Sequence, residues 1–352
     1  MREGLKILLK TFIPIIIGVV VTVLLFRHEF MAGDFSSFHF TARMAVGFAI
    51  AWIFMAGRDF GLTWRFRTIA YPQLSWGRAL RVDMMCAFTS AITPSAVGGS
   101  AFAIFYLNRE GVSLGHATTL TLTTLFLDEL FFVIFCPVIL LIVPFGELFG
   151  SNARDAIFMH SVQIVFWLVY TGIVIWTLIL YMGIIARPQF VARQIKRLFM
   201  RRWLRRWRRS AFTTADNMVH ASADLHKCPR RWWLNVFGAT TLSWFSRYLV
   251  VNALFWGFVP GSAPLLVFGR QFVVWVILMV SPTPGGSGIS EWLFTEYYGD
   301  LMNGAGMALV IAVSWRIVSY YVYLVAGSLM LPTYFGRRAR GKRPALPDKN
   351  RQ

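Results

Sequence analysis

The sequence predicts an all-α polytopic membrane protein with about six spanning helices and two oppositely oriented re-entrant helical hairpins in an inverted repeat. First, 57% of its 352 residues are hydrophobic and only 14% are charged, too few polar side chains to cover a water-facing surface. Second, most of its Lys and Arg residues gather in segments that flank apolar runs. Third, two apolar stretches are interrupted by matching Pro- and Gly-containing motifs.

Six apolar runs approach the length of a membrane-spanning helix. A helix rises ~1.5 Å per residue, so about 20 residues cross a hydrocarbon core of ~30 Å. The first run lacks the small-residue cleavage site of a signal peptide, so we expect it to be retained as a helix. The predicted helices lie at 12–26, 42–56, about 115–143, 161–185, about 233–258 and about 304–332.

The positive charge orients these helices. The net charge is +19, and thirteen of the 35 Lys and Arg residues lie within 187–231. Because cytoplasmic loops carry an excess of Lys and Arg, we place this segment and both termini in the cytoplasm, at the inner membrane of a bacterial cell. A chain of this charge would otherwise suggest nucleic-acid binding, but the clustering beside apolar runs argues against it.

Charge parity requires two apolar stretches to turn back instead of crossing. If 82–107 crossed the bilayer, the basic 187–231 segment would lie outside. A re-entrant hairpin at about 80–108, entering from the cytoplasm, restores the parity. A second hairpin at about 264–300 must enter from outside, because the basic tail after the last helix has to end inside.

The chain then divides into four parts. Within the basic part, Trp203 and Trp207 alternate with Arg and Lys, which is typical of an amphipathic helix on an anionic leaflet. The parts are a first membrane half at 1–185, a basic cytoplasmic segment at 186–231, a second membrane half at 232–335 and a basic tail at 336–352.

The two hairpins carry motifs that align without gaps at an offset of 190 residues. Gly- and Pro-interrupted segments in corresponding positions of two halves mark the substrate site of many transporters. Half-helix N-termini near Gly99 and Ser287 would direct N–H groups at an anion. The alternative is that both motifs are helix breaks packed on their neighbours. The identical pairs are Thr93 and Thr283, Pro94 and Pro284, Gly98 and Gly288, and Ser100 and Ser290.

Ionisable residues within the apolar stretches are further candidates, because a charge at the bilayer centre costs at least ~2.5–3.5 kcal/mol. We expect Arg247 and Arg316 to lie near mid-depth and to grip a phosphate, since guanidinium groups match its oxygens. Asp128, Glu129 and Glu291 would neutralise these arginines, bind a cationic group of a lipid headgroup or carry a coupling proton. Structural ion pairs between helices are the alternative. Asp83 and Arg270 are expected nearer the membrane interfaces.

These observations define a predicted substrate-binding set. The three Cys and six His residues show no metal-ligand spacing, and no catalytic grouping appears, so we expect no metal, no cofactor and no enzymatic activity. The set comprises Arg247, Arg316, Glu291, Asp128, Glu129, Pro94, Gly98, Gly99, Ser100, Pro284, Gly285, Gly286, Ser287 and Gly288.

The stretch Ser281–Glu291 resembles the lysylphosphatidylglycerol synthase transmembrane-domain family, which carries a Pro-x-Pro-Gly-Gly-x-Gly-x-x-Glu signature in its second half. The stretches Thr93–Gly99 and Asn108–Leu114 are similar to its first-half signature, and the resemblance extends from roughly the first to the last helix. In the bacterial multiple peptide resistance factor this membrane part is a lipid flippase, and a separate cytosolic domain makes the aminoacylated lipid. The resemblance therefore implies a stand-alone, flippase-like protein without the synthase domain.

The chain departs from the family at two places. Ala101–Ala103 stands where the family has a basic residue, and Leu127 precedes Asp128 where the family has an Arg. The first half-site is therefore more acidic than usual for the family.

Together, the residues and the resemblance lead to the hypothesis of a transporter for a phospholipid or another lipid-anchored anion. Its partners would be membrane phospholipids with anionic headgroups and not nucleic acid, and the sequence leaves a homo-oligomer open. Three alternatives stand beside it. They are a small-solute or ion transporter using the same broken helices, a membrane enzyme acting on lipid-linked substrates, and a non-transporting scaffold.

Overall fold

The computed structural model describes residues 40–93, 97–149, 156–201, 206, 208–283, 285–302 and 305–340, and every regular element in these ranges is helical. The predicted helix at 12–26, Pro94, Pro284 and the tail beyond 340 lie outside them. The helices of the first half are α2 (Ala42–Ile69), α3 (Trp76–Ile92), α4 (Val97–Arg109), α5 (Leu114–Ile142), α6 (Phe145–Phe149), α7 (Ala156–Tyr181) and the π-helical η1 (Met182–Ala186). The remaining elements are α8 (Pro188–Leu198), α9 (Arg208–Leu225), α10 (Arg230–Phe258), α11 (Pro264–Leu278), α12 (Ile289–Tyr298), the 3₁₀ turn η3 (Gly299–Leu301), α13 (Ala305–Arg316), the π-helical η4 (Ile317–Tyr321) and α14 (Val322–Arg340).

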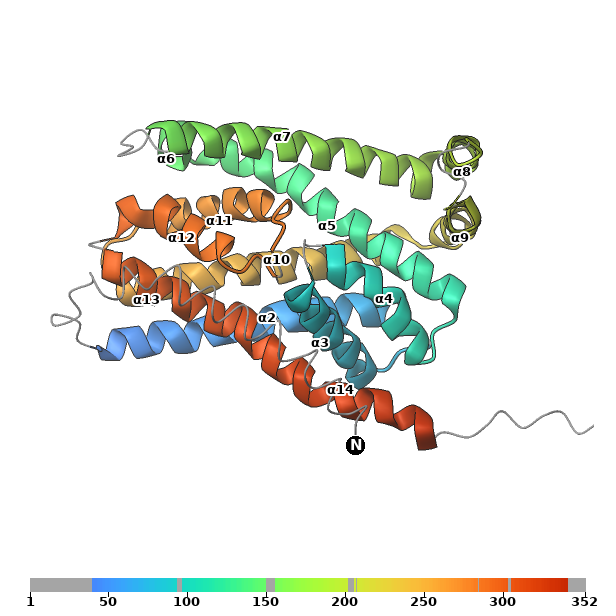
Figure 1. Ribbon diagram of the computed structural model, residues 1–352, viewed down its shortest axis with the longest axis horizontal. Coiled ribbons are helices and arrows are strands. Elements are labelled where there is room, and N and C mark those ends of the chain that lie inside the picture. The colour runs from blue at the N-terminus through green and yellow to red at the C-terminus, as the bar shows by residue number, and fades with distance from the viewer. Residues whose placement is uncertain are drawn as a thin grey trace, which may run out of the picture.

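Four helical stretches are long and apolar enough to cross a membrane, which confirms a multi-pass helical membrane protein. α10 has 29 residues and is as long as these stretches, although polar side chains such as Arg247 interrupt it. In Figure 1, α7 lies along one edge, and α13, η4 and α14 form one continuous helix across the molecule. The four stretches are Ala42–Ile69, His116–Ile142, Phe158–Ala186 and Gly306–Leu331.

The prediction that the second helix ends at residue 56 is wrong. α2 continues to Ile69 and carries Arg58 and Arg65, which composition assigned to a cytoplasmic segment. Their side chains are only 6% and 4% exposed. Asp59 and Asp128 provide carboxylate partners for them, so the helix continues through residues that a count of charges assigns to water.

α2 and α10 pack along each other as an antiparallel pair, the most extensive helix contact in the described chain. Small residues bring their backbones together. A Cβ atom added to Gly47 would lie 2.8 Å from the carbonyl oxygen of Ala253, and one added to Gly61 would lie 2.8 Å from that of Ala239. Small residues at such spacing allow close helix packing in membranes, where lipid is as apolar as the side chains.

Both predicted motifs fall between two helices that pack on each other, α3 with α4 and α11 with α12. Their glycines serve different purposes. Gly285, Gly286 and Gly288 have positive φ angles of 56°, 70° and 84°, a conformation that glycine adopts without steric cost. Gly99 instead lies in the first turn of α4, where an added Cβ atom would be 2.6 Å from the carbonyl oxygen of Cys86 in α3.

The basic segment 186–231 contains two helices, α8 and α9. The sequence had predicted a single amphipathic helix in the first part of this segment. The two pack on each other, and Lys196 Nζ of α8 lies 2.6 Å from Asp216 Oδ1 of α9. In Figure 1 both lie beyond the end of α7, at one side of the molecule. They therefore follow directly on the apolar stretch that ends at Ala186.

Candidate functional site

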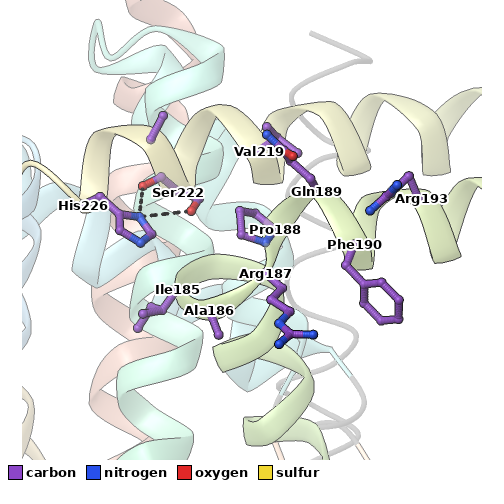
Figure 2. Close-up of a pocket in the computed structure, with 11 residues that line it drawn as sticks. Ile185, Ala186, Arg187, Pro188, Gln189, Phe190, Arg193, Val219, Ser222 and His226 are labelled. Carbon is purple, nitrogen blue, oxygen red and sulfur yellow. Dashed lines mark hydrogen bonds between the residues drawn. The ribbon is translucent and has the colours of Figure 1, made fainter.

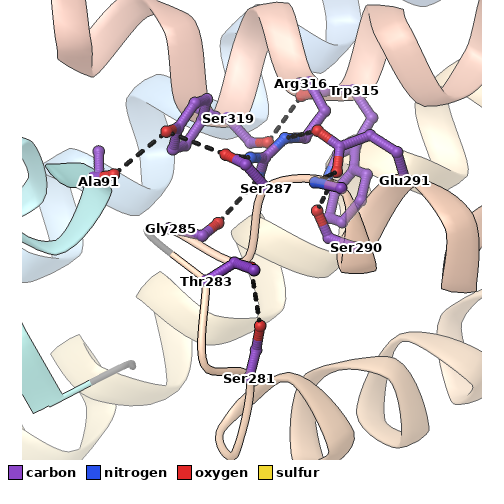
Figure 3. A network of polar contacts seen from close by, with 12 residues as sticks. Ala91, Ser281, Thr283, Gly285, Ser287, Ser290, Glu291, Trp315, Arg316 and Ser319 are labelled. Atoms are coloured by element: carbon purple, nitrogen blue, oxygen red, sulfur yellow. Dashed lines mark hydrogen bonds and ion pairs between the residues drawn. The ribbon is translucent and has the colours of Figure 1, made fainter. Parts of the chain in front are cut away.

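The two broken segments touch each other. The backbone N–H of Gly285 donates a hydrogen bond of 3.2 Å to the carbonyl oxygen of Thr93. Beside it, the Tyr320 hydroxyl donates to the carbonyl oxygen of Ala91 at 3.1 Å. Figure 3 shows this junction, with the loop of Gly285 approaching the end of α3. Two motifs that lie far apart in the sequence thus form one contact.

Arg316 binds the second motif at several points. Its Nε lies 2.7 Å from Glu291 Oε1 as an ion pair, although the angle does not suit a hydrogen bond. Its Nη2 donates to Ser287 Oγ at 3.1 Å and its Nη1 to the carbonyl oxygen of Gly285 at 3.3 Å. The guanidinium carbon stands 3.8 Å above the ring of Tyr320. Arg316 is buried and its charge is compensated within the protein.

Glu291 occupies the positive end of α12. Its Oε2 accepts hydrogen bonds from the N–H of Gly288 at 2.7 Å and from Ser290 Oγ at 2.8 Å, and the residue is fully buried. A carboxylate at a helix N-terminus is stabilised by the free N–H groups and the helix dipole. N–H groups near Ser287 were predicted to face a substrate anion, and the one at Gly288 is bound to the protein's own carboxylate.

The π-helical segment η4 lies directly beside this network. It begins at the residue after Arg316 and contains Tyr320. A π-helical turn inside an α-helix is a recurring feature of functional sites. The widened turn places the Arg316 guanidinium and the Tyr320 ring against the same loop.

Asp128 belongs to a second network, formed by α2, α5 and α10. Both terminal guanidinium nitrogens of Arg65 donate to Asp128: Nη1 lies 2.5 Å from Oδ1, and Nη2 lies 3.1 Å from Oδ2. Trp244 Nε1 donates to Asp128 Oδ1 at 2.9 Å, and Arg65 Nη1 donates to Thr240 Oγ1 at 3.3 Å. Asp128 therefore links three helices, and its charge is compensated by Arg65.

Arg58 and Arg65 were not predicted to be partners of buried carboxylates. Both lie on the face of α2 that also holds Gly61, at helical spacings of three, four and seven residues. That spacing beside a small residue was the available signal. The Arg58 guanidinium pairs with Asp59 and lies 4.9 Å from the ring of Tyr323, whose hydroxyl donates to both oxygens of Asp59 at 2.7 and 2.8 Å.

Asp83 and Arg270, which were predicted nearer the membrane interfaces, are both buried within the protein. Arg270 is 1% exposed and pairs with Asp300 (Nη2–Oδ2 2.7 Å). It also donates to the carbonyl oxygens of Tyr297 and Glu147 at 2.8 and 2.9 Å. Asp83 is 2% exposed, and its Oδ2 has no hydrogen-bond partner in the described part of the chain.

Arg247 differs from the other arginines in the middle of the helices. Its guanidinium carbon lies 4.9 Å from the ring of Trp244 and 4.6 Å from that of Trp275, and the side chain is half-buried. Among the described residues it has no ion pair or hydrogen bond, whereas Arg58, Arg65, Arg270 and Arg316 each have a carboxylate partner.

Glu129 is the acidic counterpart of Arg247. It is half-buried, and its Oε2 has no hydrogen-bond partner within the described ranges. Its neighbour Asp128, by contrast, is held by Arg65 and Trp244. Two adjacent carboxylates on α5 therefore differ: Asp128 is fixed in a network, whereas Glu129 Oε2 has no hydrogen-bond partner among the described residues.

The structure divides the predicted substrate set into two groups. Gly285, Ser287, Gly288, Glu291 and Arg316 form the network at the helix breaks. Asp128 and Arg247 lie in the second network, where Trp244 contacts both. Among the described residues no contact joins Arg247 to Arg316, although both were predicted to grip one headgroup. The side chain of Ser100 lies outside the described residues.

The fold and site define a multi-pass helical membrane protein in which two helix breaks meet beside buried charges. The chain belongs to the family described as the lysylphosphatidylglycerol synthase TM region, whose sequence model matches residues 11–327. It is 21% identical over 329 residues to a UPF0104 membrane protein of Archaeoglobus fulgidus. This alignment covers 90% of the present chain and 94% of the relative. No solved structure matches the chain. The resemblance noted at Ser281–Glu291 is confirmed.

Proposed function

We propose that this protein moves an anionic phospholipid, or another lipid-linked anion, across the inner membrane of a bacterial cell, and that it is a transporter and not an enzyme. Membership in a family of lipid-synthase membrane regions supports a lipid substrate. The observation that carries the proposal is the Arg247 guanidinium, which lies between Trp244 and Trp275 and has no ion pair or hydrogen bond among the described residues.

A charge without a partner inside a membrane protein calls for a functional reason, because it is costly to insert. The indole faces on either side of Arg247 stabilise the cation without neutralising it. An arriving phosphate would supply the missing negative charge and accept hydrogen bonds from the guanidinium nitrogens. Arg247 is therefore the primary headgroup-binding residue in this proposal, and Arg316 positions the second motif.

In the proposed topology, α3–α4 and α11–α12 are re-entrant hairpins that enter from opposite faces in an inverted repeat. The lengths of the four helices support it: they have 17, 13, 15 and 10 residues. At ~1.5 Å per residue, each is shorter than the ~30 Å hydrocarbon core. Six spans, including α10 and the predicted helix at 12–26, then leave both termini in the cytoplasm.

Transport would require the contact between the two breaks to open. The hydrogen bonds from Gly285 to Thr93 and from Tyr320 to Ala91 join the halves in the present state. A headgroup passing between the halves would have to replace these bonds, while its acyl tails stay in the lipid. Glu129, whose Oε2 has no hydrogen-bond partner in the described part of the chain, is the residue suited to carry a coupling proton.

Reconstitution in liposomes tests the proposal. The full-length protein is incorporated with fluorescent phosphatidylglycerol or phosphatidylcholine, and transfer between leaflets is followed by chemical quenching of the outer leaflet. We expect the protein to accelerate transfer of the anionic lipid, and Arg247→Gln to slow it at least tenfold.

Arg43→Gln is the matched control. Arg43 also stacks on a tryptophan, with its guanidinium carbon 5.0 Å from the ring of Trp256, but its side chain is exposed at the start of α2. It should retain wild-type transfer. Failure of the wild type to move any lipid, or equal activity of Arg247→Gln, would contradict the proposal. Uptake of soluble phosphate without lipid transfer would favour the small-solute alternative.

A further inference from the structure

A second basic site lies away from Arg247, where the apolar stretch ending at Ala186 meets α8 and α9. A pocket of about 500 Å³ opens there. Figure 2 shows His226, which directly follows α9, together with Arg187 at the start of α8 and Arg193 within α8. The lining residues are Ile185, Ala186, Arg187, Pro188, Gln189, Phe190, Arg193, Val219, Ser222, Ala223 and His226.

The polar lining is suited to an anion. Among the lining residues that the structure describes are two arginines and a histidine, and none is Asp or Glu. Asp216, which lies nearby on α9, is paired with Lys196, so its charge is compensated. The remaining polar groups are the hydroxyl of Ser222 and the amide of Gln189, which are neutral donors.

His226 already has one ring nitrogen engaged. Its Nδ1 lies 2.8 Å from the carbonyl oxygen of Ser222, an acceptor, so Nδ1 carries the hydrogen. The other ring nitrogen, Nε2, is the atom left for a ligand, and it donates to a phosphate oxygen when the ring is protonated. No ion pair of Arg187 or Arg193 with a carboxylate is found among the described residues, and both side chains are exposed.

The apolar lining indicates a lipid instead of a free anion. Ile185, Phe190 and Val219 form part of the wall. Phe190 is exposed, as are Leu198 and Met200 further along the same segment. Apolar side chains beside Lys and Arg at the end of a membrane span are typical of segments that lie at the boundary between headgroups and acyl chains.

We infer that this pocket binds the phosphate-bearing headgroup of an anionic phospholipid of the leaflet that faces α8 and α9. Arg187, Arg193 and His226 surround the phosphate, and Phe190 and Val219 contact the glycerol and the first methylenes of the acyl chains. Basic pockets between helices at the cytoplasmic side of membrane proteins bind anionic lipids in this way. The site is separate from the transport route and does not depend on the proposed function.

The test measures lipid binding to the full-length protein in detergent by native mass spectrometry, with dioctanoyl phosphatidylglycerol as the probe. All proteins carry Arg247→Gln, so that binding at the proposed transport site does not contribute. The double variant Arg187→Gln/Arg193→Gln should bind the lipid at least tenfold more weakly, since each guanidinium removed takes away charge-assisted hydrogen bonds to the phosphate.

The matched control is Arg197→Gln/Arg201→Gln, which removes two exposed charges from the same segment without altering the pocket lining. It should change binding less than threefold. Equal losses in both double variants would overturn the inference, because binding would then be diffuse electrostatic attraction. Ala223→Trp, which fills the pocket without changing its charge, should also weaken binding and provides a second variant if the first fails to fold.

Two competitors distinguish the source of the phosphate. Inorganic phosphate should displace the lipid only at concentrations at least a hundredfold above that of the lipid, because it lacks the apolar contacts. Dioctanoyl phosphatidylcholine should compete poorly, because it carries no net charge. Displacement by inorganic phosphate at the concentration of the lipid would overturn the lipid assignment.

Discussion

The backbone N–H of Gly285 donates a hydrogen bond to the carbonyl oxygen of Thr93, 192 positions earlier in the chain. Each residue belongs to one of two motifs that align in the sequence, and each motif separates two short helices. The bond therefore joins the two halves of the protein at their irregular backbone, where polar groups inside a membrane need a protein partner.

We predict that Gly285→Ala destabilises the protein by about 1–3 kcal/mol, because φ at this residue is +56°. The added methyl group would also lie 2.3 Å from the Tyr320 ring and 2.9 Å from the carbonyl oxygen of Ala91. Thermal unfolding in detergent measures the effect. Gly299→Ala serves as the control, since no atom lies within 4 Å of its added Cβ atom. Equal unfolding temperatures for the two variants would show that the junction tolerates a side chain.

Glu291→Gln should destabilise the protein by about 3–5 kcal/mol, because it leaves the buried charge of Arg316 without its partner. Adding Arg316→Gln should then cost less than the same change in the wild type, with a coupling energy of about 0.5–3 kcal/mol. A double-mutant cycle of unfolding free energies measures this coupling. Glu296→Gln, an exposed position on the same helix, is the control. Additive effects at 291 and 316 would contradict a structural ion pair.

The adjacent carboxylates Asp128 and Glu129 should respond differently to neutralisation. Asp128→Asn weakens the bidentate pair with Arg65 and should lower the unfolding temperature. Oε2 of Glu129 has no hydrogen bond among the described residues that Glu129→Gln could remove. This variant should therefore leave stability unchanged or raise it, because burying a charge without a partner is unfavourable. Thermal unfolding of both variants checks the contrast, and a larger loss for Glu129→Gln would show that its carboxylate is a structural partner.

Close packing of α2 on α10 predicts that Gly61→Ala is destabilising. The added Cβ atom would lie 2.8 Å from the carbonyl oxygen of Ala239 and 3.0 Å from the Cβ atom of Ser243. Gly238→Ala lies on α10 with no atom within 4 Å, so it should be neutral or stabilise by up to about 1 kcal/mol through helix propensity. Unfolding temperatures that rank the two variants in the opposite order would rule out this packing account.

The proposed orientation predicts that the α8–α9 segment is accessible from the cytoplasm alone. A cysteine introduced by Arg201→Cys, with Cys228 replaced by Ser, should react with a membrane-impermeant maleimide in inverted vesicles and not in intact cells. Arg201 is exposed just after α8, so its accessibility does not depend on unfolding. Labelling of intact cells would reverse the topology and would assign the hairpins to the opposite faces.

Much of the architecture was predictable from local patterns. The apolar runs at 115–143 and 161–185 correspond closely to α5 and to α7 with η1. The run at 304–332 forms part of the continuous helix from α13 to α14, which extends to Arg340 into the segment predicted as a basic tail. Pro and Gly located both helix breaks, because these residues interrupt helices wherever they occur. The end of the second helix was missed, because a rule based on charge assigns Arg58 and Arg65 to water unless their partners are known.

The grouping of the buried charges was not predictable in the same way. The sequence placed Arg247 and Arg316 at one level, near mid-depth. Depth alone does not say which side chains meet, because that depends on the rotation of each helix and on its neighbours. The contacts assign Glu291 to Arg316 and Asp128 to Arg65, and leave Arg247 between two indoles.

By itself, the sequence determined that this is a multi-pass helical membrane protein, where its helices break and to which family it belongs, because hydrophobic length, Pro and Gly act locally. Only the tertiary structure decided which charges are compensated and which are not. An ion pair such as Arg65–Asp128 requires two helices to meet at one height and on facing sides, and the packing of small residues along α2 and α10 sets that arrangement.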